Sequence, residues 1–330
     1  MLTRLTFRQL EYCVAASEFG SISLAAESIS VSPSSISAAI TQVESELQVA
    51  LFVRLHGQGL SLTPVGEEVI RQVRVVMESA SALYEVADQA QRGMRGTLRV
   101  GCFSTLAAMV TPELCQAFAR AHPTVEVSLV EDDHEGLMHR LRMAQIDVAI
   151  TYDLSAEPDI VFEPLAPLPP YALVSETDPL AQQPSTSLDE LSQLPMILLD
   201  MPLSREYFVS LFRSAGLMPR IAARSASGDV VRSLVANGFG YSLFNARPRA
   251  NLSLDGKRLV EVPLTGKHRP MMLGLAWAAQ QKRRRVVEAF MERCRTFVSK
   301  DYIPGMRPGA VRSPPGGELP GTARSCAGSG

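Results

Sequence analysis

A heptad repeat of apolar residues runs through residues 64–94 of this sequence. Its members follow one another at alternating intervals of four and three residues, from Val69 to Met94. Such a repeat is the a/d seam of a coiled coil, which stays exposed to water unless another helix covers it. We therefore expect a linker helix whose dimerisation seam consists of Val69, Val73, Val76, Ala80, Leu83 and Ala87. Packing of this helix on another domain of its own chain is the alternative.

The long helix divides a chain of 330 residues into unequal domains. Hydrophobic residues make up 46%, which is enough for separate cores, and charged residues make up 20%, which argues against a disordered protein. We expect an all-α domain with a β-wing at 1–63, the linker helix at 64–94 and an α/β domain at 95–300. Glycine and proline are dense in 301–330, which predicts a disordered tail.

Three short helical patterns precede the linker helix. The apolar face of the first consists of Phe7, Leu10 and Val14. Gly20 ends this helix, and Ser21 is placed to cap the second. The third begins at Ser32-Pro33, since serine is a preferred N-cap and proline suits the first helical position.

The third helix has an apolar face and a small polar face. The apolar face consists of Ile36, Ile40, Val43 and Leu47, and the polar face of Ser34, Ser35, Ser37, Ala38, Thr41 and Gln42. Two short helices joined by a tight turn, with such an outer face, suit insertion into the major groove of DNA. A plain three-helix bundle explains the same periodicity. Two short alternating runs around a glycine-rich turn then predict a β-wing, where Arg54 is placed to contact phosphate or the minor groove.

The net charge of the N-terminal region does not favour binding to nucleic acid. The whole chain has a net charge of −2, and residues 1–63 contain three Arg against five Glu, also −2. Phosphate neutralisation should therefore contribute little affinity per monomer, which predicts a shallow salt dependence of DNA binding.

From residue 97 onward, short β-rich runs alternate with amphipathic helical runs. The expected strands are 98–103, 125–130, 147–151, 171–175, 196–200, 221–224, 241–245 and 271–278, and the expected helices are 106–121, 136–143, 228–237 and 282–300. Such alternation is typical of a mainly parallel sheet flanked by helices.

Several classes of protein are disfavoured by what the sequence lacks. The five cysteines and five histidines show no metal-binding spacing, so we expect no metal, no cofactor and no disulfide framework. There is no secretory signal or bilayer-spanning apolar run, which fits a cytoplasmic protein without membrane contact. The run Gly238-Phe-Gly-Tyr-Ser matches neither a dinucleotide-binding loop nor a nucleophile elbow, so we expect no enzyme.

The N-terminal motifs together resemble a known family. The segments Phe7-Arg-Gln-Leu, Gly20-Ser-Ile-Ser-Leu-Ala-Ala-Glu, Val31-Ser-Pro-Ser-Ser-Ile-Ser and Leu62-Thr-Pro-Val-Gly-Glu are similar to the signature of LysR-type transcriptional regulators. This similarity spans the first 67 residues and continues more loosely to about residue 298. It departs from the family pattern at Ser32, where Gln is usual, at Ala38-Ala39, where Arg-Gln is usual, and at Gln48, where Gly is usual.

The resemblance implies a ligand-responsive regulator that binds a dyad operator in double-stranded DNA. It implies a self-associating protein, a dimer or tetramer, with RNA polymerase as a further partner. The expected DNA-contacting residues are Ser21, Ser32, Pro33, Ser34, Ser35, Ser37, Thr41, Gln42 and Arg54. It also implies a periplasmic-binding-protein-like effector domain, with subdomain I at about 95–163 and 266–300 and subdomain II at about 164–265.

Ligands in such folds lie at the carboxyl ends of strands and the N-termini of helices. Candidates for binding a small, anionic effector are Ser104, Thr105, Ser204, Arg205, Ser225 and Ser227. Ordinary N-capping explains any one of these serines equally well. Asp133 and His134, in the loop after the second strand, are secondary candidates, because most acidic loops are simply solvated.

The sequence also bears on two other functions. A redox sensor would need a cysteine pair in the second subdomain, and no cysteine lies between Cys115 and Cys294. Cys102 and Cys115 are expected to be buried, small apolar side chains. A solute-binding or enzymatic α/β domain with an N-terminal dimerisation module is the remaining alternative.

Overall fold

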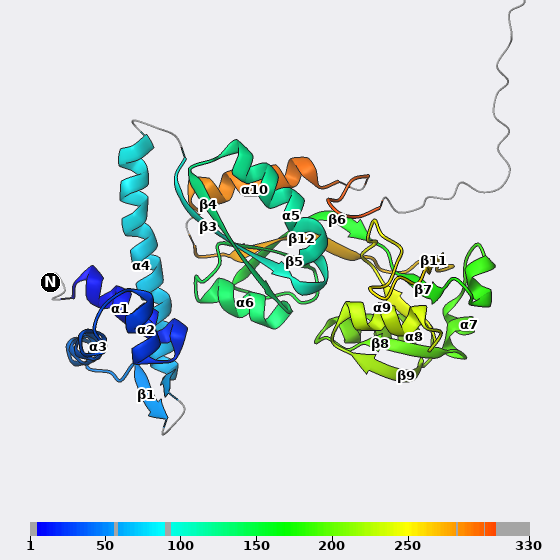
Figure 1. The fold of residues 1–330 in the computed structure, drawn as a ribbon, viewed down its shortest axis with the longest axis horizontal. Coiled ribbons are helices and arrows are strands. Elements are labelled where there is room, and N and C mark those ends of the chain that lie inside the picture. Colours follow the sequence, from blue (N-terminus) through cyan, green and yellow to red (C-terminus); the bar gives the residue numbers. More distant parts are fainter. Residues whose placement is uncertain (1–4, 56–58, 90–93, 282, 300, 308–330) are drawn as a thin grey trace, which may run out of the picture.

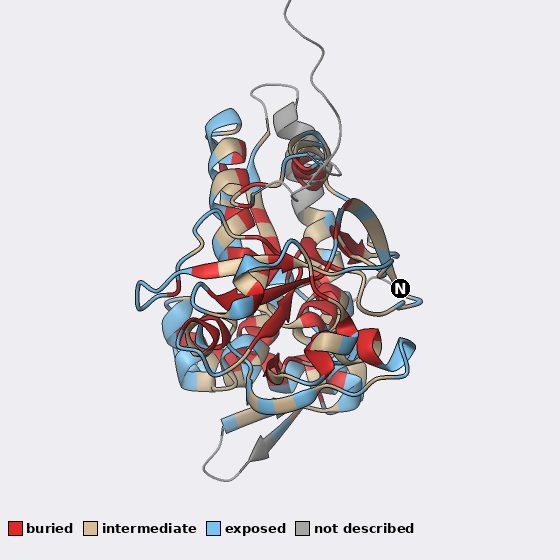
Figure 2. Cartoon of the chain, turned by 90° about the vertical axis from the view of Figure 1, so that its right-hand side faces the viewer, coloured by how far each residue is buried: buried red, intermediate tan, exposed pale blue. Residues whose placement is uncertain are grey.

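The computed structural model describes residues 5–55, 59–89, 94–281, 283–299 and 301–307, with the side chains of 54–55 and 81–89 left out. An N-terminal helical domain, a long helix and a two-part α/β region follow one another along the molecule (Figure 1). Buried residues are concentrated on the central strands and on the helix faces that cover them (Figure 2).

The N-terminal domain is a winged helix-turn-helix. Its elements are α1 (Phe7–Phe19), α2 (Ile22–Ser28), α3 (Pro33–Leu47), β1 (Phe52–Leu55) and β2 (Gly59–Leu62). The predicted helix signals are confirmed, since Gly20 ends α1 in the left-handed conformation and Ser21 and Ser32 are the N-caps of α2 and α3. A 2.7 Å hydrogen bond from the Leu60 amide to the Gly20 carbonyl joins the antiparallel wing to the end of α1.

The predicted apolar face of α1 is wrong at Phe7, whereas Leu10 and Val14 are half-buried and Val14 packs against the core of the domain. Phe7 is 56% exposed, and the buried side chains of α1 are Tyr12, Cys13, Ala15 and Ala16. Ala16 lies in the same buried cluster as Ala25 and Ala26 of α2, so small side chains make up much of the contact region between these helices.

The linker helix α4 (Pro64–Gln89) uses one face for packing within its own chain. Gly66, Ile70, Val73 and Arg74 are buried, and a Cβ on Gly66 would lie 2.0 Å from the Leu51 carbonyl oxygen. Of the predicted seam, Val73 is therefore already covered, Val69 and Ala80 are half-buried, and Val76 is 47% exposed. The side chains of Leu83 and Ala87 lie outside the described residues.

The first α/β subdomain is a five-stranded sheet in the order β4-β3-β5-β12-β6. Its strands are β3 (Gly96–Phe103), β4 (Val125–Asp132), β5 (Val148–Tyr152), β6 (Ile160–Leu168) and β12 (Met271–Ala278). β3 is parallel to β4 and β5, whereas β12 is antiparallel to β5 and β6. Helices α5 (Ser104–Ala121) and α10 (Arg285–Phe297) cover one face, and α6 (His134–Arg142) covers the other (Figure 1).

The second α/β subdomain contains two small sheets, β10-β7-β11 and β8-β9. Its strands are β7 (Tyr171–Ser175), β8 (Pro195–Leu199), β9 (Arg220–Ser225), β10 (Ser242–Phe244) and β11 (Leu259–Pro263). Its helices are the 3-10 turn η1 (Pro179–Gln182), α7 (Leu188–Ser192), α8 (Ser204–Ser214) and α9 (Gly228–Ala236). A 2.7 Å hydrogen bond from the Ile197 amide to the Tyr241 carbonyl joins the two sheets.

The chain enters the second subdomain later than the sequence indicated. The expected crossover near residues 163–165 lies inside β6, which continues in the first sheet to Leu168. Pro164 and Pro167 belong to β6, and proline is tolerated there because β6 is the edge strand of its sheet. The return crossover lies between Pro263 and Met271.

The C-terminal segment 301–307 is ordered, contrary to the predicted disordered tail from residue 301. Met306 is buried in the core of the α/β region, and Ile303 packs against that core. The Arg307 amide donates to the Arg247 carbonyl at 2.9 Å, and the Arg249 amide donates to the Gly305 carbonyl at 3.2 Å. For residues 308–330 the disordered tail stays a prediction, because these residues lie outside the described ranges.

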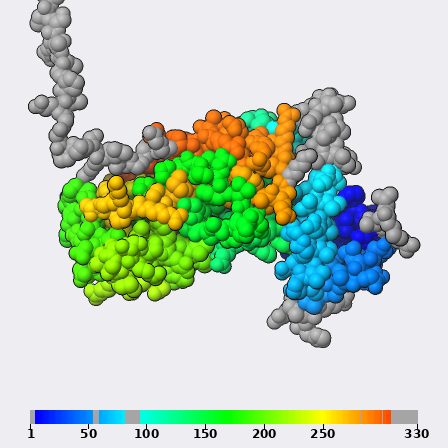
Figure 3. Space-filling model, turned by 180° about the vertical axis from the view of Figure 1, so that it is seen from behind, coloured from blue at the N-terminus to red at the C-terminus, as the bar shows by residue number. Residues whose placement is uncertain are grey.

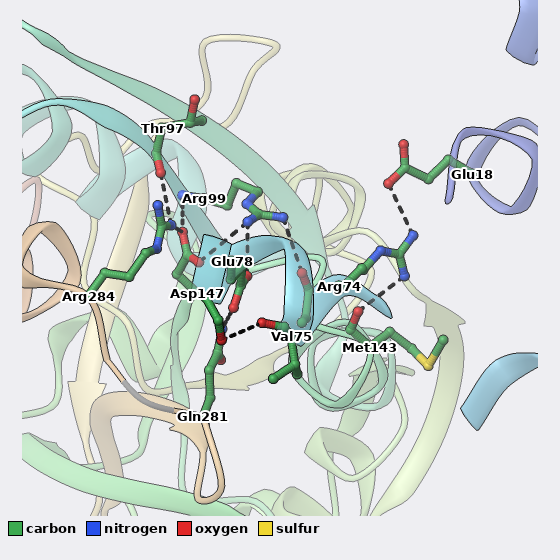
Figure 4. A network of polar contacts seen from close by, with 12 residues as sticks. Glu18, Arg74, Val75, Glu78, Thr97, Arg99, Met143, Asp147, Gln281 and Arg284 are labelled. Atoms are coloured by element: carbon green, nitrogen blue, oxygen red, sulfur yellow. Dashed lines mark hydrogen bonds and ion pairs between the residues drawn. The ribbon is translucent and has the colours of Figure 1, made fainter. Parts of the chain in front are cut away.

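The linker helix lies between the N-terminal domain and the α/β region (Figure 3). A polar network joins it to the first subdomain (Figure 4). Glu78 of α4 pairs with Arg99 of β3 at 3.0 Å and accepts from Gln281 at 2.8 Å. Asp147 accepts from the Arg99 amide at 2.7 Å and from the Arg284 guanidinium at 2.8 Å. Burial raises the pKa of the Glu78 carboxyl.

Candidate functional site

The outer face of α3 carries the residues predicted to contact DNA. Ser34, Ser37, Thr41 and Gln42 line one shallow surface hollow together with Ala38 and Ser45. Thr41 and Gln42 are exposed, and the Thr41 hydroxyl also donates to the Ser37 carbonyl at 3.0 Å. Four predicted side chains therefore share one accessible face of a single helix.

The remaining predicted residues lie around this face. Ser21 and Ser32 are N-caps, and Ser32 accepts from the Ser35 amide at 3.2 Å. The Ser32 hydroxyl also lies 2.8 Å from the hydroxyls of Ser34 and Ser35, so the start of α3 is a small hydroxyl cluster. Pro33 is exposed at the first position of α3. Arg54 pairs with Leu60 in the wing, and its side chain lies outside the described residues.

The structure places two of the departures from the family pattern. Ala39 is buried, so position 39 faces the core of the domain and only position 38 faces outward. Gln48 follows α3 with φ of 57°, the left-handed conformation that favours glycine.

Two of the five glutamates in this domain are engaged in structural contacts. Glu44 accepts hydrogen bonds from the amides of Leu51 and Phe52 at 2.7 and 3.1 Å, which positions the start of the wing. Glu18 pairs with Arg74 of α4 at 3.1 Å. Part of the acidic charge therefore has a folding role, which sequence counting could not show.

A cavity of about 350 Å³ lies between the two α/β subdomains, and we call it the central cavity. Of the six predicted effector residues it is lined by Ser104, Thr105, Ser204 and Ser227. The first two come from subdomain I and the other two from subdomain II. The topology therefore brings together four hydroxyls from three separate helix starts.

Two of these helix starts have no side-chain cap. The N-cap residues of α5 and α8 are Phe103 and Leu203, and neither side chain caps its helix. Leu203 has φ of 61°, a strained conformation for leucine. By contrast, Ser227 caps α9 by accepting from the Val230 amide at 3.4 Å. In α8, however, the amides of Ser204 and Arg205 already donate to the Pro202 and Met201 carbonyls at 2.6 and 2.9 Å.

Arg205 and Ser225 do not line the central cavity, so the structure does not bring them together with the other four predicted effector residues. Arg205 pairs with Asp200 at 2.8 Å, and the Ser225 hydroxyl accepts from the Ser227 amide at 3.2 Å. Both side chains contact residues close to them in the sequence. Arg205 is the second residue of α8, and its side chain reaches back toward the end of the preceding strand.

Other cavity residues were missed by sequence reasoning. Arg232 of α9 is 8% exposed and donates to the carbonyls of Ala250 and Leu252 at 3.3 and 3.2 Å. Asn245 donates to the Leu168 carbonyl at 2.7 Å, and its side-chain carbonyl is buried without a partner in the described part of the chain. Both residues lie on elements that approach the cavity from elsewhere in the sequence, and no local motif marks them.

The cysteines do not form a redox pair among the described residues. Cys13, Cys102 and Cys294 are buried and Cys115 is half-buried. Burial raises the pKa of the Cys13 thiol to about 12 and that of Cys115 to about 11. Such thiols remain protonated and unreactive at neutral pH. No helix in the described ranges is long and apolar enough to cross a membrane.

Comparisons with known proteins match both halves of the chain. The model of the bacterial regulatory helix-turn-helix protein, lysR family, matches residues 7–67, and that of the LysR substrate binding domain matches residues 91–299. HTH-type transcriptional regulator CysB of Haemophilus influenzae is 26% identical over 87% of this chain and 89% of its own. Transcriptional dual regulator GltC of Bacillus subtilis is 30% identical over 72% of this chain and 80% of its own.

A solved structure agrees along nearly the whole chain. HinK, a LysR family transcriptional regulator from Pseudomonas aeruginosa, superposes with a TM-score of 0.61 and 34% sequence identity. The match covers 89% of this chain and 99% of HinK.

A winged helix-turn-helix joined by a long helix to a two-subdomain ligand-binding domain defines a ligand-responsive, DNA-binding transcriptional regulator. The chain belongs to the LysR family of such regulators. The predicted fold class and function are therefore confirmed.

Proposed function

We propose that this regulator binds a two-fold-related operator as a homo-oligomer and senses a small organic anion in the central cavity. The observation that carries the effector assignment is a cavity lined by hydroxyls from both subdomains and by the buried Arg232. The helices α5, α8 and α9 begin at this cavity, and the positive end of a helix dipole favours negative charge. The apolar lining, which includes Met109 and Phe208, suits the body of a small carboxylic acid.

The buried Arg232 strengthens the case for an anion. Its described hydrogen bonds go to two carbonyl groups and to no carboxylate. A buried guanidinium without a counter-ion is costly, and a ligand carboxylate would compensate its charge. Asp229 also lines the cavity but is exposed at the start of α9, where the helix dipole stabilises its charge.

The DNA contacts would come from α3 of two copies. The α3 face offers hydroxyls and the Gln42 amide, which can pair with base edges in the major groove.

Self-association through α4 is supported by Val65 and Val76, which are 50% and 47% exposed and lie three turns apart on one side of the helix. RNA polymerase is proposed as a partner on family grounds alone, and catalysis forms no part of the proposal.

Effector binding would close the central cavity, because its hydroxyls come from both subdomains. Closure would shift how subunits pack and so alter the spacing of the paired N-terminal domains.

A thermal-shift screen of small carboxylic acids and amino acids tests the effector assignment. A ligand should raise the melting temperature by mass action in the native chain. Ser104→Ala should reduce this shift, and Ser225→Ala, the same change outside the cavity, should preserve it. If both variants respond like the native chain, the central cavity is not the anion site.

A gel shift with the intergenic DNA flanking the protein's own gene tests operator binding. Failure to bind any divergent intergenic region would favour the alternative, a solute-binding domain with an N-terminal dimerisation module.

A further inference from the structure

A second cavity, of about 440 Å³, lies in the first subdomain where α6 begins. We call it the α6 cavity. It is lined by the start of α6, the end of β5, the segment 153–157 and the strands β6 and β12. Tyr152 is the one residue that lines both this cavity and the central cavity. The α6 cavity is therefore a separate space on the α6 side of the sheet.

Two deeply buried polar side chains on this cavity have an unpaired atom. Thr151 of β5 is 0% exposed, and His134 of α6 is 3% exposed. The Thr151 hydroxyl and the His134 Nδ1 atom have no hydrogen-bond partner in the described part of the chain. Leaving a buried polar group unpaired is unfavourable for the folded state. A ligand that supplies the missing partners would recover this free energy.

The neighbours of His134 determine which hydrogen bond it can offer. The Ser155 hydroxyl donates to the Glu157 carboxylate at 2.9 Å and lies 2.8 Å from His134 Nε2. Because the Ser155 proton is directed to Glu157, Nε2 must carry the hydrogen that bridges to Ser155. Nδ1 of the neutral ring is then an acceptor, and the Thr151 hydroxyl can donate or accept.

The charged groups around the cavity are already matched. Arg269 pairs with Asp153 at 2.7 Å, and Asp153 also accepts from the Met272 amide at 2.7 Å. Arg142 pairs with Glu157 at 2.7 Å. A charged ligand would have to break one of these pairs, whereas an uncharged one would not.

The remaining walls are apolar and include Met138, Ile160 and Phe162. We propose that the α6 cavity is a second small-molecule site, which takes an uncharged, mainly apolar ring that bears a hydrogen-bond donor, as in phenols and indoles. The donor bonds to His134 Nδ1, and the Thr151 hydroxyl completes the polar contacts. This proposal does not depend on the anion assigned to the central cavity.

Helix α6 connects this site to the N-terminal domain. It has nine residues and is about 14 Å long. His134 begins the helix at the cavity, and Met143, which caps its other end, is packed in the apolar core of the N-terminal domain. Occupation of the site would therefore act on an element that contacts the DNA-binding half directly.

The test compares phenol with toluene on the full-length protein. The readouts are the melting temperature and the fluorescence of Trp277, the single tryptophan, which directly follows the cavity residue Ala276. Phenol should bind at least about tenfold more tightly than toluene, because only phenol satisfies the buried acceptor. Equal affinities, or no binding of phenol, would overturn the proposal.

Variants locate the binding site. Thr151→Val should weaken phenol binding about tenfold and leave the melting temperature of the free protein unchanged or higher, since it removes an unpaired hydroxyl. Thr111→Val is the matched control. The buried Thr111 hydroxyl already donates to the Ala107 carbonyl at 2.6 Å, so this change should lower the melting temperature and preserve phenol binding.

His134→Phe keeps a ring but removes the acceptor, and it should weaken phenol binding by a similar factor. Should either change prevent folding, the other supplies the test. Ser104→Ala, in the central cavity, should leave phenol binding intact. If Ser104→Ala abolishes it while Thr151→Val and His134→Phe do not, phenol occupies the central cavity and the proposed site is refuted.

Discussion

The Arg74 guanidinium of the linker helix donates a 3.1 Å hydrogen bond to the backbone carbonyl of Met143, at the C-terminal end of α6 (Figure 4). The same guanidinium pairs with Glu18 of α1 at 3.1 Å. The Met143 side chain lies in the core of the N-terminal domain. One buried arginine thus joins the linker, the DNA-binding half and the effector half of a single chain.

Replacement of Arg74 should weaken this junction. Arg74→Met leaves the buried Met143 carbonyl unpaired, so the free energy of unfolding should fall by about 1–3 kcal/mol. Urea denaturation measures the change. Arg71→Met, on the same helix, removes an exposed i,i+3 pair with Glu68 and should cost less than about 0.5 kcal/mol. Similar losses in the two variants would show that the Arg74 contacts are unimportant.

Gln42 should contribute to the recognition of the operator. Gln42→Ala is expected to weaken specific DNA binding by about 1–3 kcal/mol, because Gln42 has the longest side chain in the α3 hollow and its amide can pair with a base edge. Gln48→Gly should preserve the affinity for DNA and stabilise the fold by up to about 1 kcal/mol, since glycine adopts the left-handed backbone conformation at position 48 without strain. Quantitative gel shifts compare the two, and greater loss in Gln48→Gly would contradict the assignment.

The salt dependence of DNA binding should be shallow. Residues 1–63 have a net charge of −2, so few phosphates can be neutralised by each monomer. The slope of log affinity against log salt concentration, measured by fluorescence anisotropy, should stay well below ten for a dimer. A slope of about ten would require more basic contacts than the three arginines of residues 1–63 offer.

The C-terminal segment should depend on Gly305. Its φ is +70°, and a Cβ would lie 2.1 Å from the Met109 carbonyl oxygen, so Gly305→Ala should displace residues 301–307 from the two subdomains. Gly256→Ala is the control, because Gly256 has φ of +82° but nothing within 4 Å. Limited proteolysis should cut after residue 298 faster in Gly305→Ala alone. Equal rates would mean that the segment adapts to the added methyl group.

His134 should make stability depend on pH. Burial lowers the pKa of its imidazole below the ordinary 6.5, although the nearby carboxylates of Glu157, Asp133 and Glu135 oppose this shift. Below pH 6.5 the unfolded chain therefore binds more protons than the folded chain, and the free energy of unfolding falls as the pH decreases. Well above pH 6.5 both states are neutral at this residue.

The comparison of the native chain with His134→Phe isolates this contribution. Urea denaturation between pH 5 and 8 should show a flatter decline on the acid side for the variant. An unchanged decline would assign the acid sensitivity to other groups.

Much of the N-terminal half could be predicted from local sequence. The N-caps Ser21 and Ser32, the end of α1 at Gly20 and the hydroxyl-rich face of α3 each depend on residues within one or two helical turns. Hydrogen bonds at caps and the periodicity of a helix are short-range effects, so the sequence carries them directly.

Tertiary structure decided the features that join distant segments. Arg232 and Asn245 line the central cavity while Arg205 turns to Asp200, because the cavity depends on how two subdomains meet. The heptad predicted a covered seam, but only the fold showed that Val73 is buried within its own chain and Val76 is not. Met143 enters the N-terminal core and Met306 the α/β core for the same reason: burial of an apolar side chain depends on which surfaces come together in space, and periodicity along the chain does not record that.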